Sequence, residues 1–332
     1  MRLGLMLGYW GAQPNDPIDL VREAEQLGYD SAWFAEAYGS DVFSPLCWAG
    51  ARTSRIKLGT AVMQISARTP ACVAMTAATI DHLSKGRLIL GMGVSGPQVV
   101  EGWYGQPFPK PLARTREFVE IVRKILRREE PVEYAGKHYP LPFPGGTGLG
   151  KPLTLIVHPL RSHIPIYLGA EGPKNVALAA EIADGWLPLF VSPFRFGIFE
   201  EPLRGMKDGF EIAATVVVNI NNDIAQALMP IKASIAFYMG GMGAPQQNFH
   251  VNLLQRMGFG EPVARIQELF LSGRRAEAIA AVPDEIADEI SLVGPPERIR
   301  ERLRPWLESP VTTLIAGTQD PAVLRLLAEE LL

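Results

Sequence analysis

Short apolar runs alternate along the chain with longer segments in which apolar residues recur at every third or fourth position. The first such pair is Leu3–Tyr9, which is largely apolar, and Pro17–Leu27, in which the apolar residues keep helical spacing. Continuous apolar runs are typical of strands that are buried on both faces. The predicted strands are Leu3–Tyr9, Ser31–Tyr38, Ile56–Ile65, Arg87–Ser95, Pro165–Gly169, Gly185–Val191, Glu211–Asn219 and Val311–Gly317.

A helix-like segment follows nearly every one of these runs. Asp16 is a good N-cap before Pro17, and Gly28 is a good stop, so the first helix is well bounded. Eight successive β–α units predict an α/β fold, the closed (β/α)₈ TIM barrel. An open, doubly wound sheet is the alternative, but the first strand ends in Gly8–Gly11 without the G-x-G-x-x-G turn of that fold. The other predicted helices are Ser44–Ser54, Pro70–Ser84, Pro111–Arg128, Lys174–Ala183 and one that begins after Asp320.

Two segments interrupt the alternation. Residues 130–160, after the fourth helix, are rich in proline and glycine and are expected to form a hairpin-bearing insertion. Residues 223–307, between strands seven and eight, are mostly helical in pattern, with a Gly- and Met-rich break at Met239–Gly243. The glycines Gly240–Gly243 would let this second insertion close over the barrel as a lid. We therefore expect residues 1–332 to form a single barrel domain with two insertions.

The composition excludes several classes of protein. Hydrophobic residues make up 47% of the chain and charged residues 20%, which excludes a disordered or fibrous protein. The 32 basic and 35 acidic residues give a net charge of −3, so no general attraction to nucleic acid or to an acidic membrane is expected. No apolar run reaches the roughly 18 residues of a membrane span, and we predict a cytoplasmic protein. Cys47 and Cys72 lie in apolar runs and are expected to be buried, inert thiols.

The active site of such a barrel lies where the strands end and the helices begin. After strand four, small residues and a Gly-Pro helix start leave backbone N–H groups available to an anion. The turn after strand five repeats this arrangement, although Glu171 adds negative charge and could instead cap the helix. The predicted phosphate cradle comprises Gly93, Ser95, Gly96, Pro97 and Gln98 with Gly169, Ala170, Glu171, Gly172, Lys174 and Asn175.

The end of strand two carries the candidate catalytic residues Glu36, Tyr38 and Asp41. Glu36 interrupts an apolar strand, where a carboxylate needs a partner or a raised pKa, so it is either a structural acid or a site residue. Tyr38 and Asp41 are placed for substrate contact, although Asp41 could equally cap the next helix. Asp81-His82 is expected on an exposed helix surface. The histidines show no metal-ligand spacing, and no metal site is predicted.

Several motifs along the chain form a recognisable set. The longest are Asp81–Gly93 and Ser95–Trp103; the others are Gly28–Trp33, Ile56–Val62, Arg68–Ala71, Gly172–Asn175 and Ala183–Trp186. Together they resemble the luciferase-like monooxygenase superfamily of flavin and deazaflavin oxidoreductases, and specifically its coenzyme F420-dependent branch. The resemblance covers essentially the whole chain.

The resemblance implies a barrel that holds the cofactor ring in its mouth, against a bulge at the end of strand three. That bulge, often with a non-prolyl cis peptide bond, should fall at Thr60, Ala61 and Val62. The cofactor phosphate would lie at the loops after strands four and five. The implied reaction is hydride transfer between C5 of the deazaflavin and a small organic substrate, as in methylenetetrahydromethanopterin reductase, and the family habit implies a homodimer.

One departure limits what the resemblance implies. Sugar-phosphate dehydrogenases of this branch carry a histidine and a glutamate where this chain has Ala37 and Pro97 or Gln98, so neither that substrate nor that acid–base pair is expected. The proton donor stays open among Glu36, Tyr38 and Asp41, with Tyr238 from the second insertion as an outsider.

Two other functions remain open from the sequence. An FMN-dependent monooxygenase of the same superfamily would use the same phosphate cradle, and a cofactor-free binding barrel would use none. F420 differs from FMN in its longer anionic tail, which needs a partly basic exit from the mouth. Lys110, Arg114, Arg161 and Lys174 could provide that exit.

Overall fold

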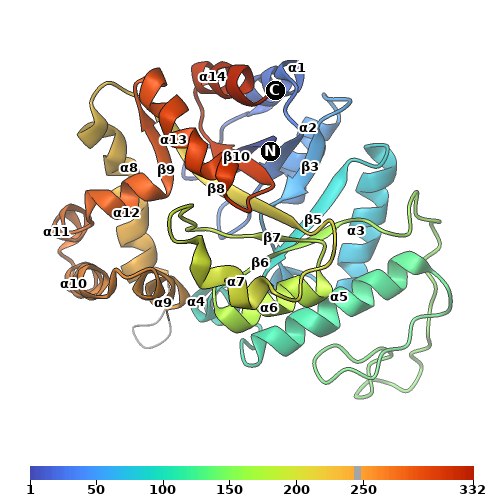
Figure 1. The fold of residues 1–332 in the computed structure, drawn as a ribbon. Helices are drawn as coiled ribbons and strands as arrows, with labels where there is room; N and C mark the ends of the chain where they lie inside the picture. Colours follow the sequence, from blue (N-terminus) through green and yellow to red (C-terminus); the bar gives the residue numbers. More distant parts are fainter. Residues whose placement is uncertain (243–247) are drawn as a thin grey trace.

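A ring of parallel strands surrounded by helices forms the centre of the molecule in the computed structural model, which describes residues 1–242 and 248–332 (Figure 1). Within the described residues, eight strands form the ring, and the third is divided by a short break into β3 and β4. The ring strands are β1 (Arg2–Gly8), β2 (Ser31–Phe34), β3 (Lys57–Thr60), β4 (Met63–Gln64), β5 (Leu88–Gly93), β6 (Ile166–Gly169), β7 (Gly185–Leu187), β8 (Glu211–Ile220) and β10 (Thr313–Gly317).

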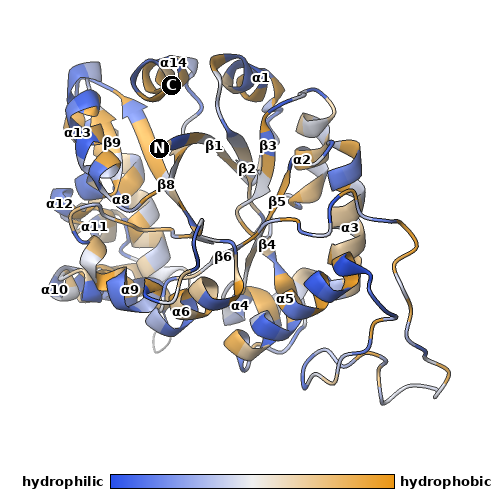
Figure 2. Cartoon of the chain, turned by 45° about the vertical axis from the view of Figure 1, so that its right-hand side comes forward, coloured by the Kyte–Doolittle hydropathy of each residue, from blue (hydrophilic) through white to orange (hydrophobic). Residues whose placement is uncertain are grey.

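The ring is closed by β10, which pairs in parallel with β1 on one side and with β8 on the other. Thr313 lies opposite Arg2 in β1 and opposite Ala213 in β8. Because the strands all point the same way, one end of the barrel collects their N-terminal ends, here called the base, and the other collects their C-terminal ends, here called the mouth. The predicted TIM barrel is confirmed (Figure 2).

Side chains fill the inside of the barrel. Six buried residues from six different strands form a separate hydrophobic cluster, as the interior layers of such a barrel require. The backbone must approach this cluster closely, since a Cβ at Gly59 would lie 2.2 Å from the Trp33 ring. The barrel therefore offers no pore, and a ligand is confined to its mouth. The cluster consists of Trp33, Ile89, Tyr167, Leu187, Ala213 and Ile315.

Helices cover the outside of the ring and bury a second, larger core against it. In Figure 1, α8–α12 gather on one side of the barrel, and α3 and α5 lie on the opposite side. Thr69 accepts a hydrogen bond from the Cys72 N–H and Pro70 follows it, so α3 starts with a Thr-Pro cap. The helices are α1 (Ile18–Leu27), α2 (Phe43–Gly50), α3 (Pro70–Leu83), α4 (Pro97–Gly102), α5 (Pro111–Arg127), α6 (Pro173–Ile182), α7 (Glu200–Leu203), α8 (Ile224–Gly240), α9 (Phe249–Arg256), α10 (Gly260–Leu271), α11 (Arg275–Ala280), α12 (Asp284–Glu289), α13 (Pro296–Glu308) and α14 (Pro321–Leu331).

The two insertions differ from the predicted patterns. Residues 223–307 contain a strand, β9 (Ser291–Gly294), which pairs in parallel with the end of β8. In residues 130–160 the hairpin is reduced to one antiparallel bridge between Tyr134 and Leu141. In the Met239–Gly243 break, α8 continues to Gly240, and Gly243 lies outside the described residues.

Both cysteines correct a prediction. Cys47 and Cys72 are exposed rather than buried, because they lie on the outer faces of α2 and α3. Among the described residues, no helix is long and apolar enough to cross a membrane.

Candidate active site

A break in the third strand shapes the floor of the mouth. β3 ends at Thr60, the peptide bond between Ala61 and Val62 is cis, and β4 begins at Met63. The Ala61 N–H donates to the carbonyl oxygen of Phe34, at the end of β2, over 2.6 Å. Ala61 and Val62 are partly buried against the interior cluster, so they form a small, apolar floor. The expected bulge and its cis bond are both present.

Thr60 has a different environment from its two neighbours in the bulge. It is fully buried, and its hydroxyl both donates to the Gly91 carbonyl oxygen (2.7 Å) and accepts from the Gly91 N–H (2.8 Å). A Cβ at Gly91 would lie 1.8 Å from the Thr60 carbonyl oxygen, so only glycine fits there. The Thr60 side chain therefore joins β3 to β5.

Val62 brings the ends of β5 and β6 together. A Cβ at Gly93 would lie 2.5 Å from Val62 Cγ2, and a Cβ at Gly169 would lie 3.0 Å from Val62 Cγ1. The missing side chains are thus what allows both strand ends to pack against the bulge. The two glycine-bearing loops predicted from the sequence start beside the same floor residue.

Each of these loops leads into a helix that begins with proline. Ser95 has a left-handed backbone (φ 59°), and Gly96 precedes Pro97 in extended conformation without a side-chain cap. Gly172 precedes Pro173 of α6 in the same way, again without a side-chain cap. A Cβ at Gly172 would meet no atom within 4 Å, so the space beside it is open. Uncapped helix starts leave backbone N–H groups that suit an anionic group.

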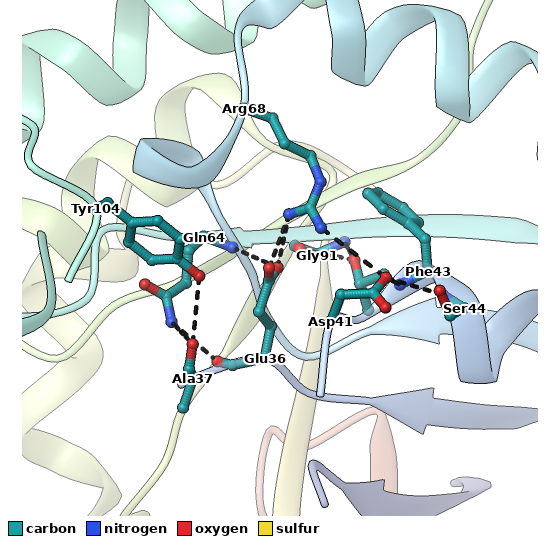
Figure 3. A network of polar contacts seen from close by, with 10 residues as sticks. Glu36, Ala37, Asp41, Phe43, Ser44, Gln64, Arg68, Gly91 and Tyr104 are labelled. Atoms are coloured by element: carbon teal, nitrogen blue, oxygen red, sulfur yellow. Dashed lines mark hydrogen bonds and ion pairs between the residues drawn. The ribbon is translucent and has the colours of Figure 1, made fainter. Parts of the chain in front are cut away.

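Glu36 belongs to a polar network on the other side of the bulge (Figure 3). Arg68 Nη1 donates to both carboxylate oxygens of Glu36, each over 2.8 Å, and the Glu36 side chain is only 3% exposed. The Gln64 side-chain amide donates to the carbonyl oxygens of Glu36 and Ala37, and the Tyr104 hydroxyl also donates to Ala37. This ion pair fixes the β2 end against the bulge.

The two carboxyls of this network have opposite pKa shifts. Burial raises the pKa of Glu36 above its usual value, although the hydrogen bonds and charge of Arg68 oppose the shift. Burial also acts on Asp41, but hydrogen bonds from Ser44 and Phe43 outweigh it and hold the Asp41 pKa below its usual value. Asp41 Oδ1 accepts both backbone N–H groups over 3.0 Å at the start of α2, which is the capping geometry considered as its alternative role.

Aromatic side chains form another part of the mouth. Tyr9 and Tyr38 are partly exposed at the ends of β1 and β2, and Tyr238 comes from α8. Burial, with the nearby Tyr9, Glu171 and Tyr38, raises the pKa of Tyr238 above its usual value. Tyr238 packs edge-to-face on Phe190, with ring centroids 5.2 Å apart.

Glu171 does not cap the α6 helix. Its Oε1 lies 2.7 Å from Nδ1 of His250 on α9, and its carbonyl oxygen accepts a 2.6 Å hydrogen bond from Arg256. The carboxylate therefore points away from the backbone N–H groups of its own loop.

The predicted basic exit is only partly assembled. Arg114 lines a cavity of about 460 Å³ next to the bulge, together with Arg68, Lys137 and His138. Arg161 lies at the base instead, where it donates to buried Asp81 and to the carbonyl oxygen of Leu88, the first residue of β5. Two predictions are therefore wrong: Arg161 cannot serve the exit, and Asp81 is not on an exposed surface. Lys110 and Lys174 are exposed.

The barrel, the bulge and the two helix starts are features of one family. The chain belongs to the luciferase-like monooxygenase family, whose sequence profile matches residues 1–313. A Mycobacterium tuberculosis protein, provisionally named a coenzyme F420-dependent oxidoreductase, is 53% identical, over 99% of this chain and 98% of the relative. The 5,10-methylenetetrahydromethanopterin reductase of Archaeoglobus fulgidus is 31% identical over 90% of this chain and 88% of the relative. The solved coenzyme F420-dependent tetrahydromethanopterin reductase of Methanopyrus kandleri superposes with a TM-score of 0.77 at 28% identity, over 99% of this chain and 97% of that one.

Three side chains at the mouth are not marked as site residues by their local sequence. Arg68 lies in a family motif, and the one signal for it is that a buried Glu36 requires a cation. His250 has no metal-ligand spacing, and the sequence around Arg256 carries no signal. His250 and Arg256 reach the mouth only through the folding of the second insertion.

Proposed function

We propose that the protein is an F420-dependent oxidoreductase that transfers a hydride between C5 of the deazaflavin and a small organic substrate. The observation that carries this proposal is the apolar Ala61–Val62 floor, flanked by two loops that lead into uncapped helix starts. The M. tuberculosis relative, similar over nearly its full length, bears an F420-dependent name and supports the same function. When bound, the cofactor supplies the hydride chemistry, and the protein supplies position and water exclusion.

The proposed roles follow from where each group lies. Ala61 and Val62 support one face of the ring, and Thr60 holds the bulge in place. The cofactor phosphate binds between the two loops, where Ser95 can add a hydroxyl donor to the backbone N–H groups. The residues we propose for this cradle are Gly93, Ser95, Gly96, Pro97, Gln98, Gly169, Ala170, Gly172, Lys174 and Asn175.

The cavity beside the bulge favours F420 over FMN. It runs from Val94, next to Ser95, to three basic side chains: Arg114, Lys137 and His138. The anionic tail that distinguishes F420 from FMN would leave the phosphate cradle in this direction and gain favourable electrostatic contacts there. FMN, which ends at its phosphate, would leave this cavity empty.

The candidates for proton transfer differ in the hydrogen bonds that they already make. Glu36 is held by Arg68, and Asp41 accepts two backbone N–H groups, so neither carboxyl is free to move a proton. Tyr38 is exposed at the mouth and remains available. For the substrate, we propose a weakly polar or uncharged small molecule. The methylenetetrahydromethanopterin of the archaeal relatives is the first compound to test.

We also propose that the protein is a homodimer. On one side of the barrel, α3 exposes Met75 and Leu83, and the adjoining insertion exposes Leu153 and Ile156, the latter 90% exposed. His82 Nε2 lies 2.7 Å from the carbonyl oxygen of His158, which holds the insertion against α3. Figure 2 shows the insertion reaching away from the barrel. So much exposed apolar surface suits burial against a second copy.

The test is a fluorescence titration of the purified apoprotein with F420 and, separately, with FMN. The proposal predicts micromolar or tighter binding of F420 and much weaker binding of FMN. The reverse preference would favour an FMN-dependent monooxygenase, and binding of neither would overturn the cradle. Tight F420 binding would justify a screen for oxidation of reduced F420, beginning with methylenetetrahydromethanopterin.

A further inference from the structure

A second polar cluster lies in the wall of the mouth, apart from the Glu36–Arg68 network. Its centre is the Glu171–His250 pair, in which Glu171 Oε1 and His250 Nδ1 are 2.7 Å apart. The two side chains are 14% and 16% exposed, so the pair is largely removed from solvent. The alignment does not satisfy hydrogen-bond geometry, which is common at catalytic pairs before a substrate is bound.

The pair contains buried polar atoms that the surrounding protein does not satisfy. Glu171 Oε2, His250 Nδ1 and Arg256 Nε are all buried without a hydrogen-bond partner among the described residues. Buried polar atoms are almost always paired, so the two atoms with no contact, Glu171 Oε2 and Arg256 Nε, beside the Glu171–His250 contact indicate groups kept for something other than stability. Arg256 holds the backbone of Glu171 through another of its nitrogens, Nη2, which donates to the Glu171 carbonyl oxygen and fixes the residue beside His250.

The groups around His250 come from each element that packs against it. Tyr238 on α8 meets the imidazole edge-to-face with centroids 4.7 Å apart, and Phe190 after β7 does so at 6.1 Å. Glu171, from the β6 loop, and Arg256, from the same helix as His250, are the charged neighbours. Tyr238 contacts the imidazole ring to ring and Arg256 carries only donors, so the Glu171 carboxylate, 2.7 Å from Nδ1, is the acceptor that faces this nitrogen.

The Glu171–His250 pair is close to the floor of the mouth. Glu171 follows Gly169 by two residues. Gly169 packs against Val62, since a Cβ at Gly169 would lie only 3.0 Å from Val62 Cγ1. The pair therefore belongs to the loop that begins at the floor, on the side where a substrate stacked on a ring supported by Ala61 and Val62 would meet it.

We propose that His250 is a catalytic residue that exchanges a proton with the substrate, and that Glu171 is its positioning residue. This inference rests on the proposed function. The substrate carbon gains the hydride from C5 of reduced F420, which is thereby oxidised by two electrons. In a C=O or C=N substrate the π electron pair moves to oxygen or nitrogen; in a methylene group that bridges two nitrogens, as in methylenetetrahydromethanopterin, one C–N bond breaks and its electron pair stays on nitrogen. The His250 imidazolium gives its Nε2 proton to that oxygen or nitrogen, and the reverse reaction returns both. Glu171, opposite Nδ1, keeps a proton on that nitrogen and leaves Nε2 as the exchanging atom.

The first test measures which ring nitrogen of His250 carries the proton, and it needs neither cofactor nor substrate. In ¹⁵N-histidine-labelled protein, NMR at a pH where the imidazole is neutral should show His250 protonated at Nδ1, with H250Q assigning the signal. E171Q should shift the population toward protonation at Nε2. H163Q is the matched control, since His163 lies 3.1 Å from Asp184 at the base. Protonation of His250 at Nε2 in the native chain, or no change in E171Q, would overturn the proposal.

The second test separates catalysis from a structural role. With reduced F420 and methylenetetrahydromethanopterin, or the substrate that the screen returns, H250Q should lower kcat at least about 100-fold, as loss of a general acid does. E171Q should lower kcat less and change the solvent deuterium isotope effect. F420 affinity in both variants should stay within about twofold of H163Q. If the kcat of H250Q lies within threefold of the kcat of H163Q, the proposal is wrong. If the native protein does not bind F420 at all, the proposed function is wrong instead.

Discussion

Charged groups are paired differently at the two ends of the barrel. At the base, Asp184 accepts hydrogen bonds from the Ile166 N–H, from Lys207 and from Arg123, and His163 lies 3.1 Å from it. These partners hold the pKa of Asp184 below its usual value even though burial opposes the shift. The base is thus a set of matched charges that joins neighbouring strands.

The mouth has fewer matched groups. Among the described residues, buried side-chain atoms without hydrogen-bond partners belong to the mouth in every case but Arg123 Nε; they are Gln64 Oε1, Ser66 Oγ, Glu171 Oε2, His250 Nδ1 and Arg256 Nε. The contrast teaches that this chain matches its charges at the end that stabilises the barrel and leaves more buried polar atoms unmatched at the other end, which is the end where this fold carries its active sites.

The largest effect is expected at the base. Asp184→Asn should lower the free energy of unfolding by about 3 kcal/mol at pH 7, because it leaves Lys207 and Arg123 facing a neutral amide. Because the pKa of Asp184 is depressed in the folded state, its stabilising contribution is present above the usual aspartate range and is lost as the pH falls through the folded pKa. The difference in unfolding free energy between the native protein and Asp184→Asn should therefore shrink in acid. Urea unfolding at pH 7 and pH 3 measures both. An unchanged F420 affinity is expected; a large loss of affinity would contradict the division between the two ends.

A methyl group at the floor should affect both stability and binding. In Gly93→Ala the new Cβ would lie 2.5 Å from Val62 Cγ2, so the bulge must shift, at a cost of about 1–3 kcal/mol. F420 affinity should fall at least tenfold. Gly172→Ala is the matched control, because its Cβ meets nothing within 4 Å, and its stability should change by less than about 0.5 kcal/mol. Equal stability losses in the two variants would show that Val62 does not set the packing of the floor.

The basic cavity should discriminate between the two cofactors. Arg114→Ala should weaken F420 binding about fivefold, close to 1 kcal/mol, and leave FMN binding unchanged. Raising the salt concentration should reduce the F420 difference further. Arg22→Ala on α1, remote from the mouth, serves as the control. Equal losses for F420 and FMN would place Arg114 at the shared phosphate rather than at the tail.

The smallest effect concerns the Glu36 carboxyl. Its raised pKa means that its stabilising contribution is present below the usual glutamate range and is lost as the pH rises through the folded pKa. Relative to Glu36→Gln, the native chain should therefore lose stability between pH 4 and pH 7. Thermal unfolding across this range measures the slope. A slope of the opposite sign would mean that Arg68 outweighs burial.

The sequence predicted the barrel because each strand is buried on both faces and reads as a continuous apolar run. β9 escaped prediction because Ser291–Gly294 is only four residues long and lies between helical segments. The burial of the two cysteines was predicted wrongly for a related reason. Helices α2 and α3 are apolar around much of their circumference, so their composition does not identify the face that points outward.

The site was predictable where it depends on the backbone. Glycines and prolines at strand ends located both loops, because those residue types fix local conformation. The bulge was expected only from the family resemblance. Side-chain pairs were not predictable. The pairs Glu36–Arg68, Asp81–Arg161 and Glu171–His250 form only when folding brings together segments that are far apart in the sequence.

The short strand β9 has a consequence for how such proteins can diversify. The chain leaves the ring at Ile220, and β9 brings it back beside the ring at Gly294. These two residues are paired in the sheet, and the Asn221 N–H donates to the Gly294 carbonyl oxygen. Everything between, including the helices that carry Tyr238 and His250, is a cassette whose two ends are already joined. A cassette of different length or sequence could replace it without moving the ring. One scaffold could in this way exchange the substrate-facing wall while the cofactor floor stays as it is.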